Sequence, residues 1–355
     1  MKTNRTSRGT AWMGVAALGL MGFGPCVPSA DPGTGGGGSP PTSTSTPTSK
    51  PFQPAFHVTF AGAEGAAVGT IKPAVGGHVY TTFDGGFGAS FSAAQTRGGR
   101  ATSAELSIKE GSDGNPPDGA GMGDFGMYVG LPSSLVAFDG DTMHVGVWIY
   151  VPQDFSFETN TGILKFFRWT PHKEGDNTQS SNGRLDTLIM QGSDYWNWDL
   201  GSSVTAPPGT QTGWAMGNEF NHAAEPNAFP TKRILPLSEW SYVEMMVKFT
   251  TNPAEQLRRV WVNDQFAAEF AGDTTKYYDT TGTLVTRKKP AVETITPGYG
   301  CPGFLLFTYW NGNAPGDQSV WVDAIAIHKG ESDLPAKDEL GNPMMGMANV
   351  GPDGD

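Results

Sequence analysis

The chain has 355 residues, a formal net charge of −12 and charged side chains at 16% of positions. This acidic balance argues against nucleic acid as a partner, because phosphate binding needs a concentrated basic surface. The chain contains 49 glycines and 27 prolines, and 11% of its residues are aromatic. This composition favours short strands joined by turns over long helices. We therefore expect an all-β domain in a monomeric protein.

Residues 1–30 have the pattern of an export signal. Lys2 and Arg5 begin a positively charged segment, and Ala11 to Gly24 is apolar but too short to span a bilayer comfortably. Removal of the whole signal would give a secreted protein, whereas Cys26 could accept a lipid anchor, and both alternatives remain open. We expect a secreted, periplasmic or cell-surface location, with no membrane span.

The rest of the chain divides by composition. Residues 31–50 are rich in Gly, Ser, Thr and Pro and predict a flexible linker. Residues 51–330 carry the strand patterns and predict the folded domain. Residues 331–355 are polar and interrupted by Gly and Pro, which predicts a frayed tail. With Cys26 and Cys301 as the only cysteines, no disulfide framework is expected.

Apolar patterns within the domain predict a series of strands. They lie at 55–60, 78–83, 101–109, 125–129, 145–151, 163–169, 184–190, 240–249, 258–263, 304–310 and 319–328. The strands between Asp141 and Met190 are expected to be neighbours, and 319–328 is apolar enough for the centre of a sheet. Asn263 and Asp264 predict a tight turn. The long irregular stretch 192–236 either lines a ligand groove or is pinned to the sheet by its tryptophans.

Aromatic and basic residues are densest in this central region. Trp148 and Tyr150 share one face of their strand, opposite the aliphatic residues, and predict either a stacking surface for a sugar ring or packing beneath a loop. Lys165 and Arg168 differ in strand parity. Regular geometry therefore puts their side chains on opposite faces, and a β-bulge is needed to bring them into one groove.

Several segments together resemble a known family. They are Arg100 to Ile108, Val147 to Phe155, Trp240 to Lys248, Val260 to Asp264 and Val320 to Ile327. Their order is similar to that of the concanavalin A-like jelly rolls of secreted polysaccharide lyases, of the alginate, glucuronan and heparin lyase type, from about Phe52 to Lys329. The resemblance implies a β-sandwich of two antiparallel sheets that acts on an acidic, uronate-containing polysaccharide. It also implies a structural calcium site at Asp323, with no cofactor required for catalysis.

A uronate lyase neutralises a carboxylate, removes the neighbouring proton and protonates the leaving oxygen. We expect Arg168 or Arg184 to hold the carboxylate, His172 to act as base, and Tyr309 to act as acid or, beside a cation, as base. The expected substrate contacts are Trp148, Tyr150, Lys165, Trp196 and Trp198. The competing interpretations are solvated arginines, an exposed His172 and a Tyr309 buried in the core.

Two other functions remain open from the sequence. The chain lacks the Gln-Ile-His and Gln-Val-His tripeptides found in alginate lyases, and no predicted strand has the paired carboxylates that a glycoside hydrolase of this fold would use. The six histidines show no HExxH-like spacing. A non-catalytic carbohydrate-binding module and a structural surface protein are therefore the alternatives to a polysaccharide lyase.

Overall fold

The structure is a computed structural model, and it describes a defined part of the chain. The described residues are 52–66, 68, 88–111, 127–155, 163–173, 183–191, 196–199, 202–204, 235–278, 281–288, 291, 293–307 and 314–350. Contacts divide the chain into Met1–Ser49 and Lys50–Asp355, and all described residues belong to the second unit. The predicted export signal, Cys26, the linker, strand 78–83 and Tyr309 lie outside the described residues.

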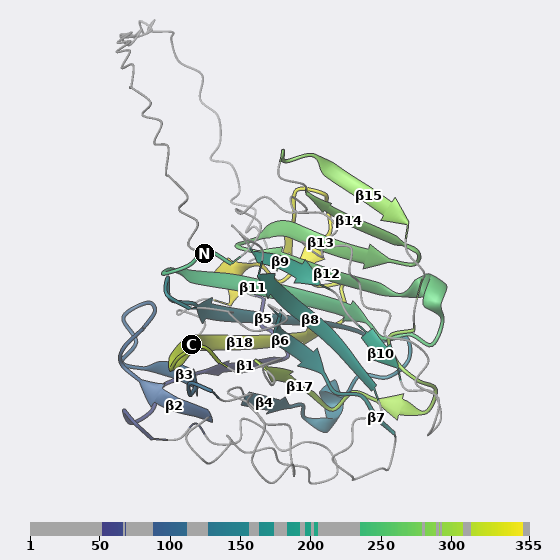
Figure 1. Cartoon of the computed structure of the whole chain (residues 1–355). Coiled ribbons are helices and arrows are strands. Elements are labelled where there is room, and N and C mark those ends of the chain that lie inside the picture. Colours follow the sequence, from purple (N-terminus) through teal and green to yellow (C-terminus); the bar gives the residue numbers. More distant parts are fainter. Residues whose placement is uncertain are drawn as a thin grey trace, which may run out of the picture. The chain divides into compact units, whose positions relative to one another are not determined.

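The larger sheet has ten antiparallel strands. Their order is β15-β14-β13-β12-β11-β5-β18-β3-β2, with β1 paired to β18 (Figure 1). The strands are β1 Phe56–Thr59, β2 Gly88–Ser92, β3 Ser103–Ile108, β5 Thr142–Tyr150, β11 Trp240–Lys248, β12 Leu257–Val262, β13 Gln265–Ala271, β14 Thr274–Tyr278, β15 Leu284–Lys288 and β18 Gln318–Lys329. β18 is flanked by β5, β3 and β1, so the prediction that this apolar strand lies inside its sheet is confirmed.

The smaller sheet has six antiparallel strands in the order β10-β8-β6-β17-β4, with β9 paired to β8. They are β4 Met127–Gly130, β6 Ile163–Trp169, β8 Gly183–Gln191, β9 Trp196–Asp199, β10 Ser202–Val204 and β17 Gly303–Leu306. Two short ribbons pair β7 His172–Lys173 with β16 Tyr299–Gly300, and β19 Ala336–Lys337 with β20 Pro343–Met344. The single-turn 3-10 helices are η1 Ser133–Leu135, η4 Pro253–Glu255 and η5 Met347–Asn349. No helix among the described residues has the length and hydropathy to cross a membrane.

The two sheets share one hydrophobic core. Val147 of β5 and Phe167 of β6 belong to the same buried cluster, and the ring of Trp169 lies 5.4 Å from that of Phe249. Burial of each such side chain contributes about 1.5–3 kcal/mol. β3 pairs with β18 in the larger sheet, and β4 pairs with β17 in the smaller one. The consecutive strands β3 and β4 therefore stay paired with the consecutive strands β17 and β18 in both layers. The fold is the expected all-β jelly-roll sandwich of two antiparallel sheets.

The central strands do not lie as the sequence analysis expects. β6 and β8 are neighbours in the smaller sheet, but β5 lies in the larger sheet between β11 and β18. The prediction of three neighbouring strands between Asp141 and Met190 is therefore wrong for the first of them. Alternation of apolar residues shows which face of a strand is buried, but it does not show which of two sheets the strand joins.

Residues 331–350 pack on the domain, in contrast to the predicted frayed tail. We call residues 331–350 the C-terminal segment. Its Met345 and Val350 are buried against Tyr242, Ala324 and Ala326 on the outer face of the larger sheet. The segment contains few apolar residues and these have no regular spacing, so the sequence gives no periodic signal for its packing.

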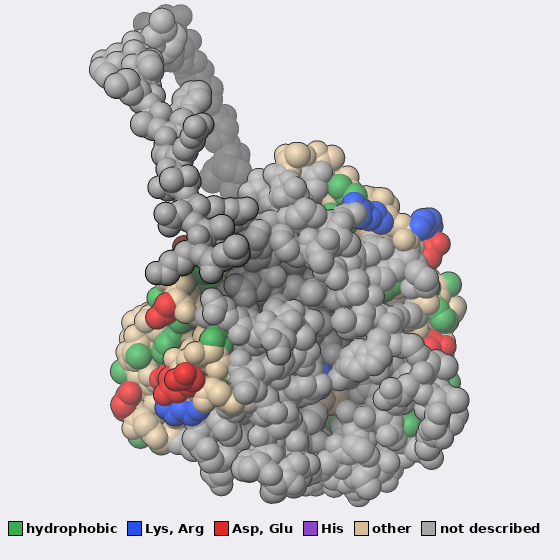
Figure 2. Space-filling view, viewed as in Figure 1, with side chains coloured by type: hydrophobic (Ala, Val, Ile, Leu, Met, Phe, Trp, Pro, Cys, Tyr) green, Lys and Arg blue, Asp and Glu red, His purple; other side chains and the backbone are tan. Residues whose placement is uncertain are grey.

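The hairpins at one edge of the larger sheet extend it beyond the predicted strands. Asn263 and Asp264 join β12 to β13 with φ of 48° and 62°, which is the type I′ turn that suits a two-residue hairpin and confirms the predicted turn. Acidic and basic side chains lie close together where β14 begins and β15 ends (Figure 2). They include the exposed ion pair of Lys288 with Asp273, 2.6 Å apart.

Candidate functional site

A β-bulge in β6 decides the placement of its two basic residues. Lys165 is opposite Leu188 of β8, Phe167 is opposite Thr187, and the register shifts between them, so Phe166 is the additional residue. Because cross-strand partners share a face, the shift moves Lys165 to the same face as Arg168. The sequence analysis required such a bulge for one groove, and the structure contains it.

A third basic position joins this face from the neighbouring strand. Arg168 is opposite Asp186 of β8, and Arg184 lies two residues before Asp186, so alternation places Arg184 on the face of Arg168. Phe167 and Trp169 on either side of Arg168 are in the core, so this face is the outer one. We call the positions Lys165, Arg168 and Arg184 the basic row. Arg168 and Arg184 are diagonal to each other across β6 and β8, and such positions are about 7–8 Å apart.

The side chain of Arg168 is buried, at 3% exposed. A buried guanidinium is stable only where it is paired and hydrogen-bonded. The interpretation of Arg168 as a solvated surface charge is therefore wrong. The same cross-strand row contains Leu305 of β17, which is also buried, and Tyr128 of β4. The sequence analysis did not single out Tyr128 or Asp186, because their nearness to Arg168 depends on pairing between distant strands.

Of the two residues expected to transfer protons, His172 and Tyr309, the structure describes only His172. His172 lies in β7, directly after β6, and is opposite Gly300 of β16. The hydroxyl of Thr170 donates a hydrogen bond to the carbonyl of Gly303, 3.0 Å away, which ties the end of β6 to the start of β17. Tyr309 lies outside the described residues. β17 ends at Leu306, and the following residue, Phe307, has a φ of 54°.

The expected aromatic residues do not accompany the basic row. Trp148 and Tyr150 lie in β5 and alternate with core residues, so they occupy the outer face of the larger sheet, on the opposite side of the sandwich. The expectation of a single surface with both kinds of residue is therefore wrong. Trp196 and Trp198 are opposite Gln191 and Ile189 of β8, and by alternation they lie on the face opposite Arg184.

Trp148 is used in packing. Its ring lies 4.2 Å from the guanidinium carbon of Arg97 and 5.6 Å from the ring of Tyr242. Its indole N–H donates a hydrogen bond to the carbonyl of Val350. Trp148 thus contacts the C-terminal segment, and of its two predicted roles the structure favours packing. The described element that covers it is the C-terminal segment, and most of the loop at 192–236 lies outside the described residues.

Asp323, the expected calcium ligand, lies beside two arginines. Its Oδ2 is 2.8 Å from Nε of Arg97 and 3.5 Å from Nε of Arg100, and its side chain is fully buried. Burial raises the pKa of Asp323, although both arginines oppose this. Among the described residues, no three His, Cys, Asp or Glu side chains form a group that could hold a metal. A carboxylate paired with guanidinium groups does not fit a calcium ligand, which would share the ion with other oxygens.

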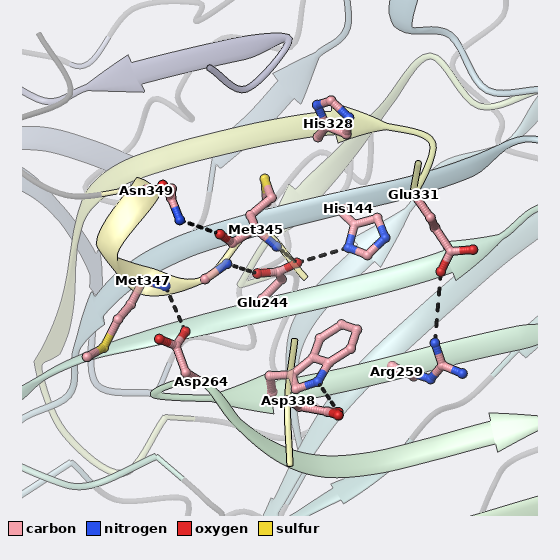
Figure 3. A network of polar contacts seen from close by, with 12 residues as sticks. His144, Glu244, Arg259, Asp264, His328, Glu331, Asp338, Met345, Met347 and Asn349 are labelled. Atoms are coloured by element: carbon pink, nitrogen blue, oxygen red, sulfur yellow. Dashed lines mark hydrogen bonds and ion pairs between the residues drawn. The ribbon is translucent and has the colours of Figure 1, made fainter. Parts of the chain in front are cut away.

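A buried polar network lies beneath the C-terminal segment (Figure 3). Glu244 of β11 is fully buried, and its Oε1 is 2.9 Å from Nδ1 of His144 on β5. The Tyr242 hydroxyl donates to Oε2 over 2.8 Å, and the backbone N–H groups of Met345 and Gly346 donate to the same carboxylate. Burial raises the pKa of Tyr242, so this phenol remains a donor.

A glycine makes room for this network. Gly146 of β5 is opposite Glu244, and a Cβ at this position would collide with the Tyr242 hydroxyl. The sequence analysis did not identify Glu244, because its partners come from β5, β11 and the C-terminal segment. The network is closed to solvent, and it holds the segment on the sheet.

No family model matches the chain, and no curated protein matches it. Solved structures with a similar fold include an alginate lyase from Chlorella virus, with 14% identity, 68% of this chain and 89% of that chain covered, and a TM-score of 0.39. An endo-1,3-beta-glucanase from Streptomyces sioyaensis has 15% identity, coverage of 79% and 99%, and a TM-score of 0.36. The binding domain of botulinum neurotoxin serotype D has 11% identity, coverage of 79% and 55%, and a TM-score of 0.33. Similarity at this level concerns the arrangement of the sheets and does not identify a substrate.

Proposed function

We propose that the protein binds an acidic, uronate-containing polysaccharide on the outer face of the smaller sheet and cleaves it by β-elimination. The observation that supports this most is the bulge at Phe166, because it adds Lys165 to the face of Arg168 and Arg184 in a protein with a net charge of −12. Basic groups concentrated on one face of an acidic protein attract an anionic ligand to that face, while the net negative charge disfavours it on the rest of the molecule. The pattern at the N-terminus supports action outside the cytoplasm.

The basic row supplies the first requirement of the reaction. Arg184 is proposed to hold the uronate carboxylate, since a guanidinium binds carboxylates with two parallel hydrogen bonds. Arg168 is proposed to fix the position of this group from within the sheet, and Lys165 to contact the next acidic unit. His172 is proposed as the base. Tyr309 is the proposed acid, and Tyr128 is a second tyrosine candidate, since the register puts it on the face of Arg168.

The test is to incubate the full chain with alginate, polygalacturonate, glucuronan and heparin and to measure the ultraviolet absorbance of the unsaturated chain ends. At least one polymer is expected to give unsaturated product. Arg184→Gln is expected to lower kcat/KM about 10- to 100-fold, because a charge-assisted hydrogen bond contributes about 1.5–3 kcal/mol. Lys288→Gln on the distant β15 edge is the matched control and should leave kcat/KM unchanged.

The outcomes separate elimination from binding. Product formation that Arg184→Gln does not reduce would show that the basic row is not the active site. Polymer binding that this variant weakens, without any unsaturated product, would refute elimination and support the non-catalytic carbohydrate-binding alternative. Absence of both binding and product with every polymer would refute the proposal as a whole.

A further inference from the structure

A groove lies on the outer face of the larger sheet, on the opposite side of the sandwich from the basic row. Its volume is about 560 Å³. The lining comes from three places: the last residues of β3, the first residues of β18 with the turn before it, and the turn that follows β5. The lining includes the side chains of Glu105, Ser107, Lys109, Asp154, Asp317, Ser319 and Trp321.

Trp321 is the aromatic residue that lines the groove, and it belongs to a largely aromatic cross-strand row. Trp321 of β18 is opposite both Glu105 of β3 and Tyr150 of β5, and Tyr150 is opposite Trp240 of β11. The ring centroids of Tyr150 lie 5.9 Å from Trp321 and 5.8 Å from Trp240. Trp321 is 9% exposed, while Tyr150 and Trp240 are half-buried. Because these rings are held in place by packing, a ligand that contacts them does not have to pay the conformational entropy of ordering them.

The polar groups of the groove are also held in place. The hydroxyls of Ser107 and Ser319 are 3.1 Å apart, and Ser319 donates to Glu105 over 2.7 Å. At the rim, Lys109 pairs with Asp317 at 2.7 Å, and the backbone N–H of Glu110 donates to the same carboxylate. The groove thus combines hydroxyls, carboxylates, one ammonium group and the indole ring of Trp321, a composition that suits a hydroxyl-rich ligand.

The charge of the groove decides the class of ligand. The acidic lining residues are Glu105, Asp154 and Asp317. The basic lining residue is Lys109, and it forms an ion pair with Asp317. The pKa of Asp317 is lowered by the hydrogen bond from Lys109, so this carboxylate stays ionised. An acidic lining repels uronates, and the described residues contain no group that could hold a metal ion. We therefore propose that this groove binds a neutral oligosaccharide, independently of the basic row.

The test uses the full chain with cellohexaose and laminarihexaose as neutral probes and hexagalacturonate as the acidic one, with binding measured by calorimetry. Ser107→Trp fills the groove with a ring, and Thr286→Trp on exposed β15 is the matched control. At least one neutral probe is expected to bind. Ser107→Trp is expected to weaken this binding at least about tenfold, since the added ring blocks access to the hydroxyls and to Trp321. Thr286→Trp should leave it unchanged.

A second pair of variants keeps the test decisive if the added ring disturbs folding. Glu105→Gln changes the charge with little change in volume and should weaken neutral binding, whereas Arg184→Gln on the other sheet should not affect it. Failure of both neutral probes to bind would overturn the inference, as would binding that neither Ser107→Trp nor Glu105→Gln weakens. Tighter binding of hexagalacturonate than of the neutral probes, lost in Ser107→Trp, would also overturn it.

Discussion

Glu244 is the residue whose partners are drawn from the most distant parts of the sequence. Its carboxylate accepts hydrogen bonds from Tyr242 and from the backbone of Met345 and Gly346, and it lies beside His144. All of these groups are away from water, so each donor depends on this acceptor. The cost of losing the carboxylate is the cost of leaving several buried donors unpaired.

Replacement of Glu244 tests this dependence. Glu244→Ala should lower the free energy of unfolding by about 3–5 kcal/mol, because it leaves buried polar partners without a charge to pair with. Urea denaturation measures the change. Glu255→Gln, at an exposed glutamate in η4, is the control and should change it by less than about 0.5 kcal/mol. An unfolding midpoint for Glu244→Ala equal to that of the natural chain would show that the network is not structural.

At the scale of single elements, the hairpin between β12 and β13 also anchors the C-terminal segment. Asp264 accepts a hydrogen bond from the backbone N–H of Met347 over 2.7 Å (Figure 3). Burial raises the pKa of Asp264 above 3.8, more than this hydrogen bond lowers it, and Glu244 adds to the increase. The folded protein therefore binds this proton more tightly than the unfolded chain does.

The sign of the pH dependence follows from that difference. The contribution of Asp264 to stability is fully present below pH 3.8 and is lost as the pH rises through its raised folded pKa. Asp264→Asn keeps the oxygen acceptor without a charge. The variant should gain stability relative to the natural chain as the pH rises from 3.8 toward neutral.

Urea denaturation of both proteins over this pH range measures the effect. Asp273→Asn is the control of opposite sign: its carboxylate has a lowered pKa because of Lys288, so its contribution is lost as the pH falls. A stability difference between Asp264→Asn and the natural chain that does not change with pH would contradict the argument.

The bulge in β6 shows what can be predicted for an element from its sequence. The sequence shows that regular alternation would put Lys165 and Arg168 on opposite faces of one strand. It also shows that a bulge between them would bring both residues to the same face. The position of the bulge at Phe166 is not visible, because it depends on how β8 pairs with β6. Asp323 differs, since its arginine partners lie more than two hundred residues earlier in the chain and local pattern does not reveal them.

For the whole molecule, the class of fold follows from composition and strand patterns, because two-residue periodicity and frequent turns permit few other architectures. The assignment of strands to sheets does not follow. β5 and β6 are consecutive in the chain but lie in different layers. Trp148 and Arg168 are therefore on opposite outer faces, and the expected site divides into two surfaces of different chemistry.

The C-terminal segment determines where the chain can be shortened. Sequence composition alone would place the end of the domain near Gly330, but Val350 is fully buried and Met345 covers part of the larger sheet. A protein ending at Gly330 would expose the rings of Tyr242 and Trp148 and is expected to aggregate on expression. A protein ending after Val350 should remain soluble and give a single peak in size-exclusion chromatography. Recombinant work on either face of this sandwich therefore has to retain the C-terminal segment, although its composition makes it look dispensable.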